Sequence, residues 1–109
     1  MDYLLSKDAK ELYKALQALK TDEEYRKFLR DLLTESEIRE FINRWKVVRM
    51  LDRKLPYEEI EKKTGMSSTT IARISKWLHK GMGGYKLMLQ RQKNQNKELV
   101  NHHTPQLAV

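Results

Sequence analysis

The chain has 109 residues and a formal net charge of +7, and this length fits one domain. It contains no Cys, which excludes disulfides and thiolate metal ligands. The first residues lack the basic and apolar pattern of a signal peptide. No apolar run approaches the about 20 residues that a membrane span needs, so we expect a cytoplasmic protein with no membrane partner.

The positive charge is concentrated in one short segment. Residues 1–66 carry fifteen Lys and Arg against fourteen Asp and Glu, whereas residues 67–93 carry six Lys and Arg and no acid. Such one-sided charge is typical of a surface that binds a polyanion such as DNA. A solvated basic face without a function is the alternative that charge alone leaves open.

Apolar residues at helical spacing predict three helices in the first half of the chain, the first at about 6–19. Thr21 and Glu24 form a capping box that opens the second helix, and Thr34 with Glu37 opens the third, which continues to about residue 53. No stretch alternates with a period of two, so the expected class is all-α with about six helices. The large apolar residues on these helices, which we expect to form the core of a dimer, include Leu12, Leu16, Phe28, Leu32, Phe41 and Trp45.

The second half begins with two shorter helices. Pro56 suits a helix entrance and precedes a helix at about 57–64. Gly65 can end that helix in a left-handed conformation. Ser67 is a good N-cap for the helix that follows.

The glycines after residue 80 predict the end of that helix. A last short helix is expected at about 85–93, which completes a single domain at 1–93. Residues 94–109 are polar and have no periodicity, so they predict a mobile tail. His102 and His103 are adjacent and on a helix could not face one ion together, and we expect no metal site and no cofactor.

Residues 57–79 have the pattern of a helix-turn-helix: a helix, a turn that contains Gly, and a second helix. Met66 is expected to fill the angle between the two helices, while Ile71 and Ile74 hold the second helix against the core. The opposite face is small at its N-terminal end and basic further on, which suits a helix that enters the DNA major groove. The residues expected to contact DNA are Ser67, Ser68, Thr69, Thr70, Ala72, Arg73 and Lys76.

Glu61 departs from the usual helix-turn-helix pattern, which places a small residue after the apolar position of Ile60. An ordinary helical hairpin is therefore the alternative structure, and a protein-interaction module without sequence-specific DNA binding is the alternative function. We favour DNA binding because the basic segment begins where the proposed reading helix begins. An enzyme is not expected, since the chain has no Cys, no Gly-rich phosphate loop after a strand, and His residues only at a helix end or in the tail.

Residues 32–78 resemble the tryptophan repressor superfamily; their sequence is LLTESEIREFINRWKVVRMLDRKLPYEEIEKKTGMSSTTIARISKWL. The YerC/YecD-type branch is similar to residues 65–89, GMSSTTIARISKWLHKGMGGYKLML. The resemblance covers about residues 8–92. It implies an all-helical homodimer in which the N-terminal helices of two subunits interlock and each subunit presents one helix-turn-helix. The expected function is a transcriptional regulator that binds specific double-stranded DNA sequences as a homodimer.

The resemblance extends to the tryptophan site only in part. Two arginines that flank the ligand in the family correspond to Arg44 and Arg73, and a Thr that lines the pocket corresponds to Thr34. Ile74, however, replaces the Gly on which the indole lies, and Trp77 replaces a Ser that helps to hold the ligand's amino end. Both side chains would occupy the space of the indole, so we do not expect a response to tryptophan. The sequence leaves open whether another effector exists, and an ion pair and a phosphate contact are the ordinary roles of the two arginines.

Overall fold

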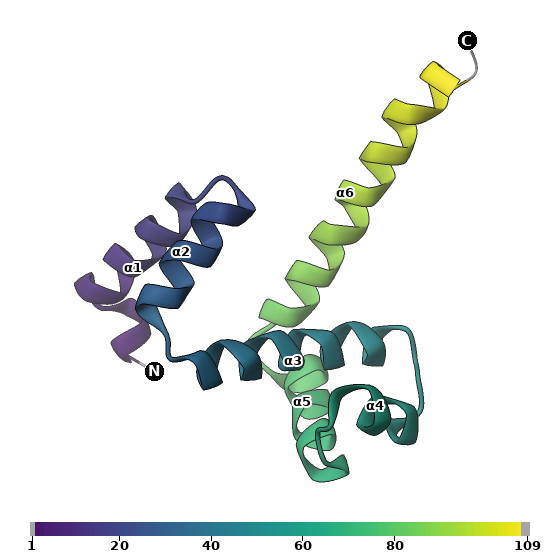
Figure 1. Cartoon of the computed structure of the whole chain (residues 1–109), viewed down its shortest axis with the longest axis horizontal. Helices are drawn as coiled ribbons and strands as arrows, with labels where there is room; N and C mark the ends of the chain where they lie inside the picture. Colours follow the sequence, from purple (N-terminus) through teal and green to yellow (C-terminus); the bar gives the residue numbers. More distant parts are fainter. Residues whose placement is uncertain (1, 108–109) are drawn as a thin grey trace. The chain divides into compact units, whose positions relative to one another are not determined.

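The computed structural model describes the backbone of residues 2–107 and the side chains of residues 2–97. The elements are a 3₁₀ helix η1 (Asp2–Leu5) and six α-helices, α1 (Lys7–Ala18), α2 (Asp22–Leu32), α3 (Glu35–Asp52), α4 (Tyr57–Thr64), α5 (Ser68–Lys80) and α6 (Gly84–Leu107) (Figure 1). The described residues contain no strand, which confirms the all-α class. Across these same residues, no helix combines the length and the apolar character that crossing a membrane requires.

The chain divides into two compact units, Met1–Arg39 and Glu40–Val109. In the first unit, side-chain caps fix where the helices begin. Ser6 Oγ accepts a hydrogen bond from the backbone N–H of the third residue of α1 at 3.0 Å, a cap that the sequence analysis did not single out. At α2, Thr21 Oγ1 accepts from the N–H of Glu24 at 3.2 Å, as predicted. The Glu24 carboxylate accepts from the N–H of Lys20 at 2.9 Å, one residue before the partner that a capping box predicts.

The second capping box, at the start of α3, is complete. The N–H of Thr34 donates to Glu37 Oε1 at 2.8 Å, and the N–H of Glu37 donates to Thr34 Oγ1 at 3.2 Å. The bond from the Thr34 backbone, followed by that from its side chain, lowers the pKa of Glu37. In the same turn, Arg39 donates a hydrogen bond to Glu35 at 2.9 Å, and this bond and the arginine's charge lower the pKa of Glu35.

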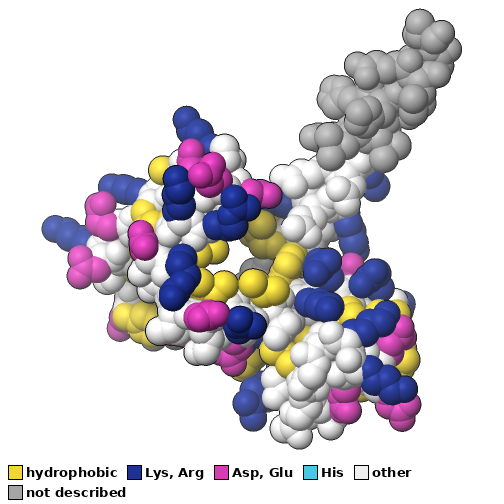
Figure 2. All heavy atoms as spheres, viewed as in Figure 1, with side chains coloured by type: hydrophobic (Ala, Val, Ile, Leu, Met, Phe, Trp, Pro, Cys, Tyr) yellow, Lys and Arg dark blue, Asp and Glu magenta, His cyan; other side chains and the backbone are white. Residues whose placement is uncertain are grey.

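The apolar faces of α1 and α2 are not covered within this unit. None of the described residues of η1, α1 or α2 is buried. Leu12 is 37% and Leu32 is 47% exposed, and Leu16 and Phe28 are only half-buried. Hydrophobic side chains are correspondingly visible among the charged ones on α1 and α2 in Figure 2.

The second unit has a core to which α3, α4, α5 and α6 all contribute. Its buried side chains are Val47, Val48 and Met50 from α3, Ile60 from α4, Ile71, Ile74 and Leu78 from α5, and Leu89 from α6. Burying a side chain of this size stabilises a fold by about 1.5–3 kcal/mol. The isoleucines of α4 and α5 therefore fix these two helices firmly to the end of α3.

Helix α5 ends at Lys80, as predicted from the glycines after residue 80. A Cβ at Gly81 would overlap the backbone carbonyl oxygen of Trp77, so this position needs a glycine. Helix α6, however, is longer than the sequence predicted, because it runs from Gly84 to Leu107 rather than ending at 93.

The expected end of the last helix at about residue 93 was thus wrong, because residues 94–107 continue the helix. Residues 91–97 are all exposed, so this part of α6 has no apolar stripe from which a helix could be predicted. Its Gln and Lys residues nevertheless have favourable helix propensity. The mobility of this segment stays a prediction, and His102 and His103 lie outside the residues whose side chains are described.

Candidate nucleic-acid interface

A tight turn joins α4 to α5 (Figure 1). Gly65 ends α4 with φ 74° and ψ 2°, and its N–H donates to the carbonyl of Glu61 at 2.8 Å, which confirms the predicted left-handed stop. The N–H of Met66 donates to Thr64 Oγ1 at 3.2 Å, and the Met66 side chain packs against the core. Backbone geometry and apolar packing therefore both set the angle between α4 and α5.

Glu61, the departure from the usual pattern, does not disturb this turn. Its side chain is half-buried, and its carbonyl oxygen holds the Gly65 N–H. Lys46 in α3 donates from Nζ to the carbonyl of Lys63 at 3.1 Å, which attaches the end of α4 to α3. The acidic residue is therefore compatible with a helix-turn-helix rather than evidence for an ordinary hairpin.

Ser67 caps α5. Its Oγ accepts from the N–H of Thr70 at 3.2 Å and lies 3.1 Å from Thr70 Oγ1, to which it donates. Two of the hydroxyls expected to contact DNA are thus already partners of each other. The first turn of α5 contains no acidic residue, which leaves the positive end of the helix dipole available to an anion.

The two faces of α5 differ as the sequence predicted. Ile71 and Ile74 are 0% exposed, and they hold one face against the core. The opposite face presents Ser68, Thr69, Ala72, Arg73 and Lys76, all exposed. Among the residues whose side chains the structure describes, no carboxylate forms an ion pair with Arg73 or Lys76. The face is consequently small at its start, positive further on, and open to solvent.

The residues matched to the family's ligand site have other contacts in this chain. The Arg44 guanidinium lies 5.6 Å from the centroid of the Trp77 ring and pairs with Glu40 at 3.3 Å. That ion pair on the helix surface is the ordinary role considered for Arg44. Ile74 is fully buried, whereas Trp77 remains 40% exposed.

Thr34 belongs to the first unit, where its hydroxyl caps α3. Sequence reasoning missed the stacking of Arg44 on Trp77, and it missed the neighbouring pair of Trp45 and Tyr85, whose ring centroids are 6.3 Å apart. Both pairs join different helices, and no local spacing indicates them. Within residues 2–97, no group of three His, Asp or Glu side chains could hold a metal ion.

The fold and this motif define a helical protein with one helix-turn-helix per chain. The family model described as Trp repressor protein matches residues 7–93, which is most of the chain. The chain belongs to the Trp repressor family.

Three similar proteins span nearly the whole chain. The uncharacterized protein YerC of Bacillus subtilis (strain 168) is 36% identical over 98 residues, which are 90% of this chain and 94% of YerC. The crystal structure of a TrpR-like protein from Eubacterium eligens ATCC 27750 superposes with a TM-score of 0.82 at 31% identity, covering 85% of this chain and 96% of that one. A Trp repressor candidate from Staphylococcus aureus superposes with a TM-score of 0.79 at 32% identity, covering 84% and 92%.

Proposed function

We propose that the protein is a transcriptional regulator that binds specific double-stranded DNA sequences as a homodimer. The observation that carries the proposal is the exposed face of α5, which has small hydroxyl residues at its start and Arg73 and Lys76 further on. In Figure 2 the surface at the start of α5 is mostly white, the colour of the backbone and of side chains that are neither charged nor hydrophobic. A helix of this kind can approach base edges closely at its tip while its cations meet the phosphate backbone.

The roles on this face divide by position. Ser68 and Thr69 lie in the first turn of α5, where side chains of a recognition helix reach base edges in the major groove. Arg73 and Lys76 lie one to two turns further along, where we expect them to contact phosphates. Ser67 and Thr70 bond to each other, so we assign them the task of capping the helix that reads the DNA.

The proposed homodimer rests on the uncovered apolar faces of α1, α2 and the start of α3. Phe41 and Ile42 are 51% and 61% exposed, and no described residue of α1 or α2 is buried. Large apolar surfaces left open on one chain are typical of interfaces. Membership of the Trp repressor family favours a second copy of the chain as the partner, with the N-terminal helices of the two copies interlocked.

We propose further that tryptophan is not the effector. Ile74 is fully buried and the Trp77 ring lies next to Arg44, so large side chains are present at positions where the family's pattern provides space for an indole. Calorimetry should detect no tryptophan binding. Micromolar affinity would contradict this assignment, and Ile74→Gly, which removes a buried side chain at a cost of a few kcal/mol, is the variant in which a cavity could reopen.

The second candidate function is a protein-interaction module with the same fold. The half-buried Glu61 and the uncharged tip at Ser68 and Thr69 favour it, because neither is a strong anchor for DNA. Neither candidate assigns a catalytic reaction to the chain, so the proposal does not describe an enzyme. The two functions differ in one property, which is whether particular DNA sequences are preferred over random ones.

Selection of binding sites from genomic fragments by the purified full chain tests the proposal. We expect enrichment of a near-palindrome whose half-sites are roughly 34–36 Å apart, about one helical turn of DNA, because two copies of α5 would enter successive major grooves. A parallel selection with Thr69→Ala controls for indirect enrichment, since this variant should show a weaker sequence preference at the bases that Thr69 contacts. Recovery of fragments without any shared sequence would favour the interaction module.

A further inference from the structure

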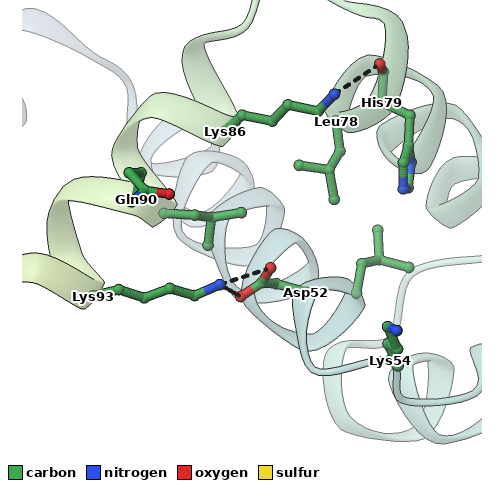
Figure 3. Close-up of a pocket in the computed structure, with 9 residues that line it drawn as sticks. Asp52, Lys54, Leu78, His79, Lys86, Gln90 and Lys93 are labelled. Atoms are coloured by element: carbon green, nitrogen blue, oxygen red, sulfur yellow. Dashed lines mark hydrogen bonds and ion pairs between the residues drawn. The ribbon is translucent and has the colours of Figure 1, made fainter.

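A pocket of about 380 Å³ lies at the C-terminal end of α5, far from the turn between α4 and α5, and between the end of α3 and the start of α6 (Figure 3). His79, which lines the pocket, lies twelve residues after Ser67, the N-cap of α5. At 1.5 Å per residue the two ends are about 18 Å apart. The pocket is therefore distinct from the proposed DNA-reading tip.

The floor of the pocket is apolar. Leu78 and Leu89 are 6% and 8% exposed, and Leu51 is half-buried against the same core. Each comes from a different helix, so the floor is a rigid junction of α3, α5 and α6 rather than a loop surface. Its volume falls within the range of small-molecule sites, which are mostly apolar with a few polar groups that orient the ligand.

The rim of the pocket is basic. Figure 3 shows Lys86 and Lys93 reaching from α6 across the two sides of the pocket, toward α5 and α3 respectively. Lys86 Nζ donates to the backbone carbonyl of His79 at 3.2 Å, and Lys93 Nζ pairs with Asp52 at 3.1 Å. Lys54 also lines the pocket. Figure 2 shows Lys and Arg side chains gathered where the start of α6 meets α3.

The lysines outnumber the acids in this rim. Among the residues whose side chains are described, Asp52 is the one carboxylate that lines the pocket, and it forms an ion pair with Lys93. Lys86 donates to a backbone carbonyl and forms no ion pair with a carboxylate of residues 2–97. An ammonium has three donors, of which this bond uses one. The amine is thus positioned over an apolar floor with donors to spare, which is an arrangement suited to a negatively charged group.

We propose that this pocket binds a small organic anion, a carboxylate or phosphate monoester attached to a compact apolar body. The apolar body lies on Leu78 and Leu89, and the anionic group accepts hydrogen bonds from Lys86, with Lys54 adding positive potential. Charge-assisted hydrogen bonds of this kind are among the strong ones in proteins. The proposal does not depend on DNA binding, and its test uses no DNA for the primary measurement.

The test follows the leucine methyl signals of the full chain by NMR during titration with benzoate and phenyl phosphate. Benzyl alcohol is the neutral probe of similar shape, and inorganic phosphate is the anion without an apolar body. We expect saturable shifts of the Leu78 and Leu89 methyl signals with at least one of the two organic anions. The neutral probe and inorganic phosphate should each bind at least about tenfold more weakly than that organic anion. If neither organic anion gives saturable shifts up to about 10 mM, the proposal is overturned.

Lys86→Gln and Lys80→Gln form a matched pair of variants. Each removes one positive charge near the end of α5, but Lys80 does not line the pocket. We expect Lys86→Gln to weaken organic-anion binding about tenfold and Lys80→Gln to leave it unchanged, with circular dichroism confirming the fold of both. Equal weakening in both variants would show general attraction to a basic surface and overturn the proposal. So would an outcome in which Lys86→Gln weakens duplex DNA binding while no organic anion binds, because the rim would then be a DNA contact.

Discussion

Thr69 and Arg73 lie on the same exposed face of α5, about one turn apart, and the proposal gives them different roles. Thr69 is at the tip of the helix and offers a hydroxyl and a methyl group, both of which can distinguish base edges. Arg73 is further from the tip and offers a charge, which every DNA sequence accepts equally through its phosphates. A residue that reads sequence and a residue that supplies affinity respond differently to substitution.

Thr69→Ala should therefore weaken binding to the preferred operator by about 1–3 kcal/mol and change binding to random duplex little. Fluorescence anisotropy with both duplexes at one salt concentration measures the two effects. Ser6→Ala is a control, because it also removes a hydroxyl at a helix start but lies outside the helix-turn-helix. Equal losses on both duplexes for Thr69→Ala would mean that Thr69 does not read bases.

Replacement of Gly65 tests the turn that sets the angle between α4 and α5. A Cβ at Gly65 would meet no atom within 4 Å, but the residue has φ 74°, which an L side chain adopts at a cost of about 1–2 kcal/mol. Gly65→Ala should lower the free energy of unfolding by about that amount in urea denaturation. Gly84→Ala is the matched control: its Cβ also meets open space, without a positive φ. If both variants lose the same stability, backbone conformation is not the reason for glycine at position 65.

Individual residues could be predicted where their role is local. Gly65 and the buried pair Ile71 and Ile74 follow from turn chemistry and helical spacing, and the structure confirms them. The stack of Arg44 on Trp77 and the bond from Lys93 to Asp52 could not be predicted. These partners are 33 and 41 positions apart in the chain, so only the packing of three helices brings them together.

The helices themselves were predictable to the extent that caps and apolar stripes mark them. Boundaries at α2 and α3 coincide with the two capping boxes, and α4 and α5 begin beside Pro56 and Ser67. The extension of α6 to Leu107 was missed because its exposed polar residues give no periodic signal. The basic pocket was also missed, since it is formed by the ends of three helices.

The stabilisation that the capping box of α3 provides depends on pH through Glu37. Its pKa is lowered by hydrogen bonds from Thr34, so the folded chain holds the proton less readily than the unfolded chain does. The stabilisation is fully present above the ordinary glutamate pKa of about 4.3. It is lost as the pH falls through the lower value of the folded state.

Glu37→Gln should accordingly reduce stability at neutral pH. The difference from the unchanged protein should shrink as the pH falls below the ordinary glutamate pKa, because the unfolded chain then binds a proton that the folded chain holds less readily. Urea denaturation at pH 7 and about pH 3, at one protein concentration, measures both differences. The lowered pKa of Glu35 affects the unchanged protein and the variant alike. A difference that is the same at both pH values would show that the Glu37 carboxylate does not stabilise α3 through its charge.

On the scale of the whole molecule, the exposed apolar residues of α1, α2 and the start of α3 predict an obligate dimer. Interlocked helices should bury more than roughly 2,000 Å² between the two copies. Sedimentation at micromolar concentration should show the mass of two chains, and dilution should lower helicity and mass together. A helical monomer at micromolar concentration would contradict the dimer, because those apolar faces would then be stable in water.

The proposed docking of α5 on DNA places Arg73 and Lys76 against phosphates, and the salt dependence of binding tests this docking most directly. The logarithm of affinity should fall linearly with the logarithm of salt concentration, and Arg73→Ala should make that slope shallower by about one unit. It should also weaken binding to operator and random duplex by the same factor. Lys10→Ala, which removes an exposed charge from α1, should leave the slope unchanged. An unaltered slope and affinity for Arg73→Ala would contradict the docking of α5 on DNA and favour the interaction module.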